Sequence, residues 1–129
     1  MKLISIVFSF KDEEKNLPEL VSRVTKVLLQ QKNWNYELIF VNDASTDKSE
    51  TILTELQKSY PITIINMSRN FGVAPCVIAG FKQAKGDAVV YMDSDLQDPP
   101  ELIEKLIAEY DNGADVVHTV RTKRLGETK

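Results

Sequence analysis

The sequence is poor in cysteine and histidine and has no long apolar run. Its one cysteine, Cys76, excludes an internal disulfide framework and is typical of a reducing compartment. No apolar stretch approaches the roughly 20 residues of a transmembrane helix. Residues 1–8 carry a short apolar run without a small-residue cleavage site, which indicates a first strand rather than a signal peptide. The net charge of −3 gives no general attraction for nucleic acid.

Glycine-rich phosphate-binding loops are also missing. No predicted strand-to-helix turn contains G-x-G-x-x-G or G-x-x-x-x-G-K-[ST]. Nicotinamide sites and P-loop NTPases need such turns because backbone amides pack against their phosphates. Neither class of site is therefore expected here.

What the sequence does contain is the composition of an ordinary globular domain. It has 129 residues, of which 43% are hydrophobic and 27% are charged. We expect one domain over residues 1–120, followed by a polar tail or truncated continuation at 121–129.

Strand and helix patterns alternate along the whole chain. Such alternation predicts an α/β fold, a Rossmann-like and mainly parallel sheet with helices on both faces. The predicted strands are residues 3–10, 37–41, 62–67, 88–92 and 115–120. The predicted helices open at Asn16 (in a capping box with Glu19), at Asp47, near Val73 and around Pro100. The third helix is expected to bury Val77, Ile78, Phe81 and Ala84.

Two carboxylates follow the predicted strand 88–92. Asp93 and Asp95 are spaced one residue apart, and the carboxyl ends of parallel strands are where open α/β sheets bind ligands. Hard oxygen donors at this position suit Mg²⁺ or Mn²⁺, which accept carboxylates together with substrate phosphates. An Asp-rich turn that caps the following helix is the structural alternative.

The other strand-to-helix turns add polar residues at the same edge. Glu13 follows the first strand, Asp43 follows the second, and Asp47 is better explained as a helix cap than as a ligand contact. Carboxylates repel a diphosphate unless a divalent cation lies between them. The edge therefore predicts a site for a metal-bridged nucleotide diphosphate.

Three segments resemble the family 2 glycosyltransferases with the GT-A fold, and most of all their polyprenyl-phosphate branch, of which dolichol-phosphate mannose synthase is the familiar member. They are Val41-Asn42-Asp43-Ala44-Ser45-Thr46-Asp47, Ser68-Arg69-Asn70-Phe71-Gly72 and the run from Met92 to Glu101. The resemblance implies inverting sugar transfer from a UDP- or GDP-linked donor to a lipid-phosphate or glycan acceptor. It also implies a role in cell-envelope polysaccharide synthesis, at the inner, cytoplasmic face of a membrane. No nucleic-acid partner is implied, and a homo-oligomer is compatible with the family.

The resemblance also implies roles for individual residues. Asp43 would bond the nucleotide base, Glu13 would lie beside the nucleoside, and Gln97 would complete the metal shell of Asp93 and Asp95. Arg121 would meet the acceptor phosphate, with a solvated tail charge as the alternative. The implied nucleotide-binding set is Ser9, Glu13, Asp43, Arg69, Asp93 and Ser94.

The sequence departs from the family at several points. Ser9-Phe10-Lys11-Asp12-Glu13 stands where Pro-x-Tyr-Asn-Glu is common, and Ala44 replaces a glycine. Family members also continue well past this length, and their general base is usually assigned to the later part, so we expect no catalytic base here. Two rival functions remain at this point. One is a nucleotide-sugar-binding module without turnover, and the other is a Mg²⁺-dependent phosphohydrolase with Asp93 as nucleophile.

Overall fold

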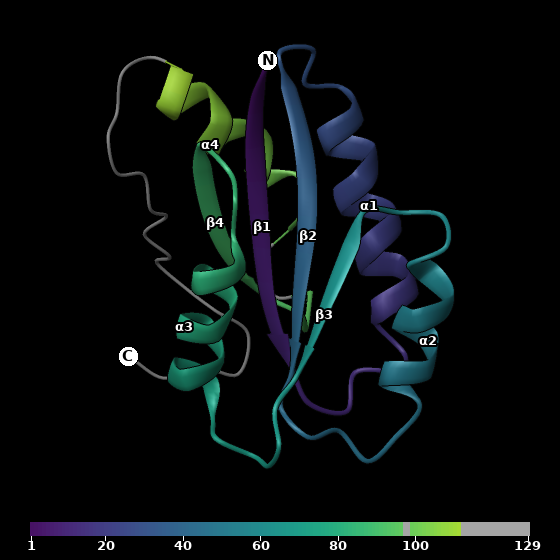
Figure 1. Cartoon of the computed structure of the whole chain (residues 1–129). Coiled ribbons are helices and arrows are strands. Elements are labelled where there is room, and N and C mark those ends of the chain that lie inside the picture. The colour runs from purple at the N-terminus through teal and green to yellow at the C-terminus, as the bar shows by residue number, and fades with distance from the viewer. Residues whose placement is uncertain (97–98, 112–129) are drawn as a thin grey trace, which may run out of the picture.

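The computed structural model describes residues 1–96 and 99–111, and these fold into alternating strands and helices (Figure 1). In chain order the elements are β1 (Lys2–Phe10), α1 (Leu17–Leu29), β2 (Trp34–Asn42), α2 (Ser49–Leu56), β3 (Ile62–Asn66), α3 (Val73–Gln83), β4 (Ala88–Asp93) and α4 (Leu102–Asp111). The predicted α/β class is confirmed. The predicted strand 115–120 and the tail 121–129 lie outside the described residues.

The four described strands form one parallel sheet in the order β3-β2-β1-β4. The chain steps outward from β1 to β3 and then returns to place β4 on the other side of β1. The strand order therefore reverses between β1 and β4. In open α/β sheets, ligands bind outside the carboxyl ends of the strands at such a point.

The larger core lies on the sheet face that α1 and α4 cover. The helical stripe expected for α1 is buried in full, because apolar residues recur along one side of the helix. Phe8 and Phe40 stack in this core with ring centroids 4.6 Å apart. α1 supplies Leu17, Leu20, Val21, Val24, Val27 and Leu28, and α4 supplies Ile103 and Ile107.

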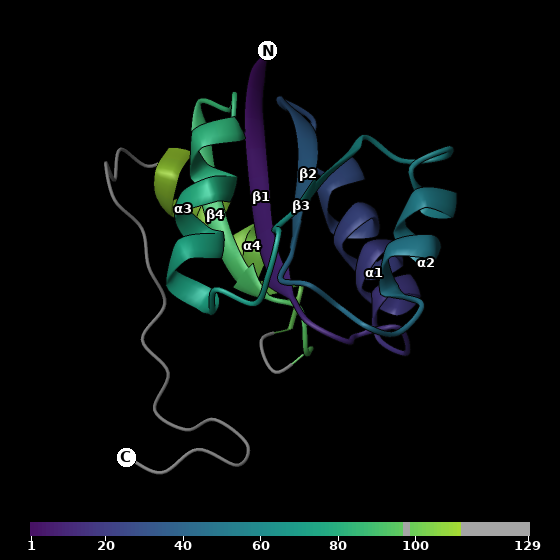
Figure 2. The same cartoon turned by 60° about the horizontal axis from the view of Figure 1, so that its bottom comes forward.

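A smaller core lies on the opposite face, under α3, so helices cover both faces as predicted (Figure 2). Here the expected buried side of α3 is wrong in part: Ile78 is 57% exposed and Phe81 is 47% exposed, whereas Val77 is half-buried and Ala84 packs against this core. Cys76 and Gly80, one turn apart, face the sheet instead. A Cβ on Gly80 would lie 2.3 Å from Cγ1 of Val7, so the helix approaches β1 more closely than a larger residue allows.

Several element boundaries also differ from the prediction. The expected capping box at Asn16 does not form, since the Asn16 side-chain amide donates to Oε1 of Glu13 and makes no cap bond. The fourth helix begins at Leu102 rather than around Pro100. Within the described part of the chain, no helix is long and apolar enough to cross a membrane.

Candidate active site

A cavity of about 560 Å³ opens at the carboxyl ends of β1, β2 and β4, beside the amino-terminal end of α3. This volume falls within the range of small-molecule sites, roughly 300–1,000 Å³. Because it lies between the ends of β1 and β4, the cavity occupies the place where the strand order reverses. Its lining consists of Ser9, Phe10, Lys11, Glu13, Asp43, Val73, Cys76, Tyr91, Asp93, Ser94 and Asp95.

Strand geometry explains why three of these side chains meet. Ser9 of β1 stands opposite Asp93 of β4 in the parallel register. Tyr91 precedes Asp93 by two residues and so points to the same face of the sheet. The Tyr91 hydroxyl lies 2.6 Å from Oγ of Ser9 and 3.0 Å from Oδ1 of Asp93. The ends of β1 and β4 are thus joined by side-chain hydrogen bonds at the cavity wall.

Asp43 anchors the loop that leads into α3. Its Oδ1 accepts from the backbone amide of Phe71 at 2.7 Å, and its Oδ2 accepts from the amide of Gly72 at 2.9 Å. Gly72 has φ +92°, a left-handed conformation that side chains with a Cβ adopt only with strain. The Phe71-Gly72 pair therefore presents two amides to one carboxylate, and that carboxylate is held at the cavity wall.

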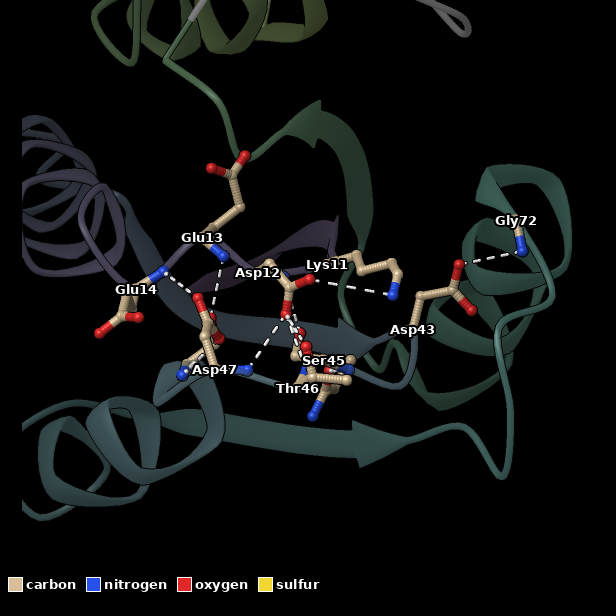
Figure 3. Close-up of polar contacts among 11 residues, drawn as sticks. Lys11, Asp12, Glu13, Glu14, Asp43, Ser45, Thr46, Asp47 and Gly72 are labelled. Carbon is tan, nitrogen blue, oxygen red and sulfur yellow. Dashed lines mark hydrogen bonds and ion pairs between the residues drawn. The ribbon is translucent and has the colours of Figure 1, made fainter.

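The loops after β1 and β2 are bonded to each other (Figure 3). Oδ1 of Asp12 accepts from the amides of Thr46 at 2.7 Å and Asp47 at 3.2 Å. In return, Oγ of Ser45 accepts from the amide of Asp12 at 2.9 Å. Asp12 and Ala44 both adopt positive φ, at 56° and 60°. The two turns that carry Glu13 and Asp43 are thus braced by one cluster of hydrogen bonds.

Asp47 belongs to this brace and to the start of α2. Its Oδ1 accepts from the amide of Ser49 at 2.9 Å, and its Oδ2 accepts from the amide of Glu14 at 3.2 Å. Asp47 does not line the cavity. The N-cap of α2 is Lys48 and makes no side-chain cap bond, so the predicted cap at Asp47 is wrong by one residue, although Asp47 accepts from the first amide of the helix.

Burial and neighbouring charge shift the pKa values of several groups around the cavity. Burial raises the pKa of Glu13, and the charges of Asp95 and Asp47 raise it further, while a hydrogen bond from Asn16 offsets part of the rise. Burial raises the pKa of Cys76 to about 11, with the carboxylate of Asp43 adding to the shift. Burial is also the main cause that raises the pKa of Tyr91 to about 12. The thiol and the phenol therefore stay neutral at physiological pH.

The donor chemistry of the cavity fits a divalent cation that is shared with a substrate. The lining contains four carboxylates and one lysine, namely Glu13, Asp43, Asp93, Asp95 and Lys11. Among residues 1–96 and 99–111, no three metal-binding side chains group closely enough to enclose an ion by themselves. Mg²⁺ typically takes one or two carboxylates and completes its shell with phosphate oxygens and water. The described residues suit that mode of binding.

Most of the predicted site residues come together at this cavity. Ser9, Glu13, Asp43, Asp93, Ser94 and Asp95 all line it. Arg69 is not in the lining, and its guanidinium lies over the ring of Phe71 at 4.8 Å. Gln97 and Arg121 lie outside the described residues. The roles assigned to all of these residues stay predictions.

Sequence reasoning gave no site role to four residues of this region: Lys11, Tyr91, Cys76 and Asp12. Tyr91 could have been found from strand periodicity, because it lies two residues before Asp93 on the same face. Cys76 gives no sequence signal for its contact with Asp43, which comes from the packing of α3 against the sheet. Asp12 gives no sequence signal for its left-handed backbone, which depends on contacts with the loop after β2.

Three curated relatives share most of this chain. An uncharacterized glycosyltransferase, YkcC, of Bacillus subtilis is 48% identical over 96% of the chain and 38% of its own length. An undecaprenyl-phosphate 4-deoxy-4-formamido-L-arabinose transferase of Pseudomonas fluorescens is 42% identical over 94% of the chain and 36% of its own length. A dolichol-phosphate mannosyltransferase of Pyrococcus furiosus is 41% identical over 88% of the chain and 31% of its own length. The chain thus spans about a third of the length of each of these relatives.

Solved structures share the fold at lower sequence identity. TarS 1-349 of S. aureus in complex with UDP-GlcNAc superposes with a TM-score of 0.71 at 24% identity, over 87% of this chain and 31% of that one. A mannosyltransferase from Pyrobaculum calidifontis in complex with GDP-Man and Mn²⁺ superposes with a TM-score of 0.69 at 18% identity, over 81% of this chain and 31% of that one. These likenesses establish a GT-A-like architecture.

The family comparison covers nearly the whole sequence. The family model for glycosyl transferase family 2 matches residues 5–129. This match, the curated relatives and the cavity at the strand-order reversal agree with one another, and the chain belongs to glycosyl transferase family 2.

Proposed function

We propose that this chain is the donor-binding part of an inverting glycosyltransferase that moves a sugar from a UDP- or GDP-linked donor to polyprenyl phosphate. The observation that carries the proposal is the gathering of Glu13, Asp43, Asp93 and Asp95 in one cavity at the strand-order reversal, in a family 2 chain. The names of the relatives favour a polyprenyl-phosphate acceptor.

The charge of the cavity decides how a nucleotide diphosphate would bind. An anionic diphosphate is repelled by carboxylates in a partly buried site, where charge interactions are stronger than in water. A Mg²⁺ or Mn²⁺ ion held by Asp93 and Asp95, with Gln97 as a further predicted ligand, would remove that repulsion. The ion would also supply Lewis-acid stabilisation of the departing diphosphate.

The remaining lining residues would bind and orient the donor. In this proposal Asp43 and Glu13 contact the base and ribose, while Ser9 and Ser94 lie beside the diphosphate. Arg69 is kept as a proposed nucleotide contact and Arg121 as a proposed contact of the acceptor phosphate. A phosphate oxygen is already ionised near neutral pH, so its attack on the anomeric carbon needs little help from a base. We assign no catalytic base within this chain.

Titration calorimetry with UDP, GDP and their sugar conjugates tests the proposal. We expect one nucleotide to bind in Mn²⁺, to lose most of its affinity in EDTA, and to lose it also in Asp95→Ala. The matched control is Glu55→Ala, which removes an acid from the exposed surface of α2 and should bind as the parent does. Absence of binding by every nucleotide in Mn²⁺ would contradict the proposal.

Turnover separates the proposed transferase from its rivals. Transfer of labelled sugar to polyprenyl phosphate would support an active enzyme, whereas metal-dependent binding without transfer would support a binding module. Release of inorganic phosphate from p-nitrophenyl phosphate would instead support the phosphohydrolase. We also propose that the complete protein works at the cytoplasmic face of a membrane, and vesicle flotation of that protein would test this location.

A further inference from the structure

Tyr91 lines the cavity but has no role in the function proposed above. Tyr91 lies on β4 between Ser9 and Asp93, and its hydroxyl is within hydrogen-bonding distance of both. An apolar side chain at this position would fill the same space under α3. The hydroxyl is therefore the feature that needs an explanation.

The carboxylate at one end fixes the direction of this hydrogen-bond chain. An ionised carboxylate only accepts, so the Tyr91 hydroxyl donates its single proton to Oδ1 of Asp93 at 3.0 Å. The phenolic oxygen then accepts the proton of the Ser9 hydroxyl across 2.6 Å. Ser9 is also tied to the residue that follows β4, because its carbonyl oxygen accepts from Oγ of Ser94 at 2.9 Å. The Tyr91 hydroxyl, which comes from β4 and donates to Asp93, is thus also held by Ser9 of β1.

We infer that Tyr91 is a positioning residue, whose hydroxyl fixes the orientation of the Asp93 carboxylate before a cation and a nucleotide diphosphate bind. The inference rests on the proposed donor site. Residues that hold a metal-ligating carboxylate in place typically change metal affinity by about 10- to 100-fold when they are replaced. The hydrogen bond also restricts the rotamers of Asp93, so less conformational freedom is lost when the cation binds.

The test compares Tyr91→Phe with Tyr36→Phe. Both changes delete one phenolic hydroxyl, but Tyr36 packs against the opposite core, away from the cavity. The quantity measured is the Mn²⁺ concentration that gives half-maximal binding, with UDP or GDP at saturation. We expect Tyr91→Phe to raise this concentration about tenfold and Tyr36→Phe to leave it unchanged.

Two further readouts separate positioning from a purely structural role. The urea midpoints of Tyr91→Phe and Tyr36→Phe, measured without metal, give the structural cost of each deletion. In addition, the losses of Mn²⁺ affinity in Ser9→Ala and Tyr91→Phe should be less than additive in the double variant, because both hydroxyls act through one hydrogen-bond chain.

The outcomes are distinguishable. Metal-dependent binding by the parent with no difference between the two Tyr→Phe variants would overturn the inference and leave the proposed function standing. A lower urea midpoint in Tyr91→Phe with unchanged Mn²⁺ dependence would overturn it in the same way, in favour of a structural bond. Failure of the parent to bind any nucleotide in Mn²⁺ would overturn the proposed function, and the inference with it.

Discussion

Cys76 shows how burial and a neighbouring charge control the chemistry of one side chain. Its side chain is buried at the base of the cavity, next to Asp43, and its pKa is raised to about 11. An unperturbed thiol has a pKa of roughly 8.5, and only the thiolate is a good nucleophile. In the native protein the thiol is both covered and protonated, so it is a packing residue and not a nucleophile.

Labelling with a thiol reagent such as DTNB checks this interpretation. At pH 8 we expect Cys76 to react at least about 100-fold more slowly in the folded protein than in urea, since both burial and the raised pKa suppress the thiolate. The urea sample serves as the control for reagent and pH. Equal rates in the two samples would contradict the burial of this thiol.

Asp12 makes a second local prediction, which concerns backbone conformation. Its φ of 56° and its acceptor contacts to Thr46 and Asp47 hold the loop after β1 against the loop after β2. Asn tolerates this conformation and keeps an Oδ1 acceptor, whereas Ala loses the acceptor and adds strain. We expect Asp12→Ala to lower the free energy of unfolding by about 1–2 kcal/mol and Asp12→Asn by less than about 0.5 kcal/mol.

Urea unfolding of both variants measures these costs, and Asp12→Gly separates their two causes. Gly removes the acceptor but relieves the left-handed strain, so its stability should lie between those of Asn and Ala. Equal stability of Asn and Ala would show that the acceptor and the strained backbone do not govern this brace.

The contact between α3 and the sheet depends on small residues. Gly80 lets the helix approach β1, because a Cβ there would lie 2.3 Å from Val7 and 3.3 Å from Cγ2 of Val41. We expect Gly80→Ala to cost about 1–3 kcal/mol through overpacking, despite the better helix propensity of alanine. The control is Ile78→Ala on the exposed side of the same helix, which should change stability by less than about 0.5 kcal/mol.

A compensating change sharpens this test. Val7→Ala makes space under the helix, so the double variant Val7→Ala/Gly80→Ala should be more stable than the sum of the two single costs predicts. Additive costs, measured by urea unfolding, would show that the close approach at Gly80 is not what limits the larger side chain.

The helices α1 and α3, which cover opposite faces of the sheet, show what the sequence predicts and what it does not. The buried stripe of α1 is predicted in full because its leucines and valines recur at helical spacing and are all covered. The buried side of α3 is not, because apolar residues occur on several sides of that helix and Cys76 and Gly80 make the close contact. Periodicity identifies a helix face only where the apolar residues are confined to one side.

The placement of the site is predicted for a different reason. In a parallel sheet all strand-to-helix turns reach the same edge, so Glu13, Asp43 and Asp93 are expected at one edge whatever the strand order. The order β3-β2-β1-β4, which puts Ser9 beside Asp93, comes from the tertiary pairing. For that reason the hydroxyl chain through Tyr91 could not be read from the alternation of strands and helices alone.

Ligand binding should couple to the stability of the entire domain, because the cavity joins the ends of β1, β2 and β4 with the start of α3. A ligand that binds only the folded state raises the free energy of unfolding by RT ln(1 + [L]/Kd), about 2.7 kcal/mol at 100 times Kd.

For the nucleotide that binds, we expect the diphosphate and Mn²⁺ together to raise Tm by several degrees. Each alone should raise it less, because the carboxylates of the cavity and the diphosphate repel each other without the cation. Thermal unfolding with and without EDTA measures the difference. Equal shifts with the nucleotide alone and with both would contradict a cation shared between Asp93, Asp95 and the diphosphate.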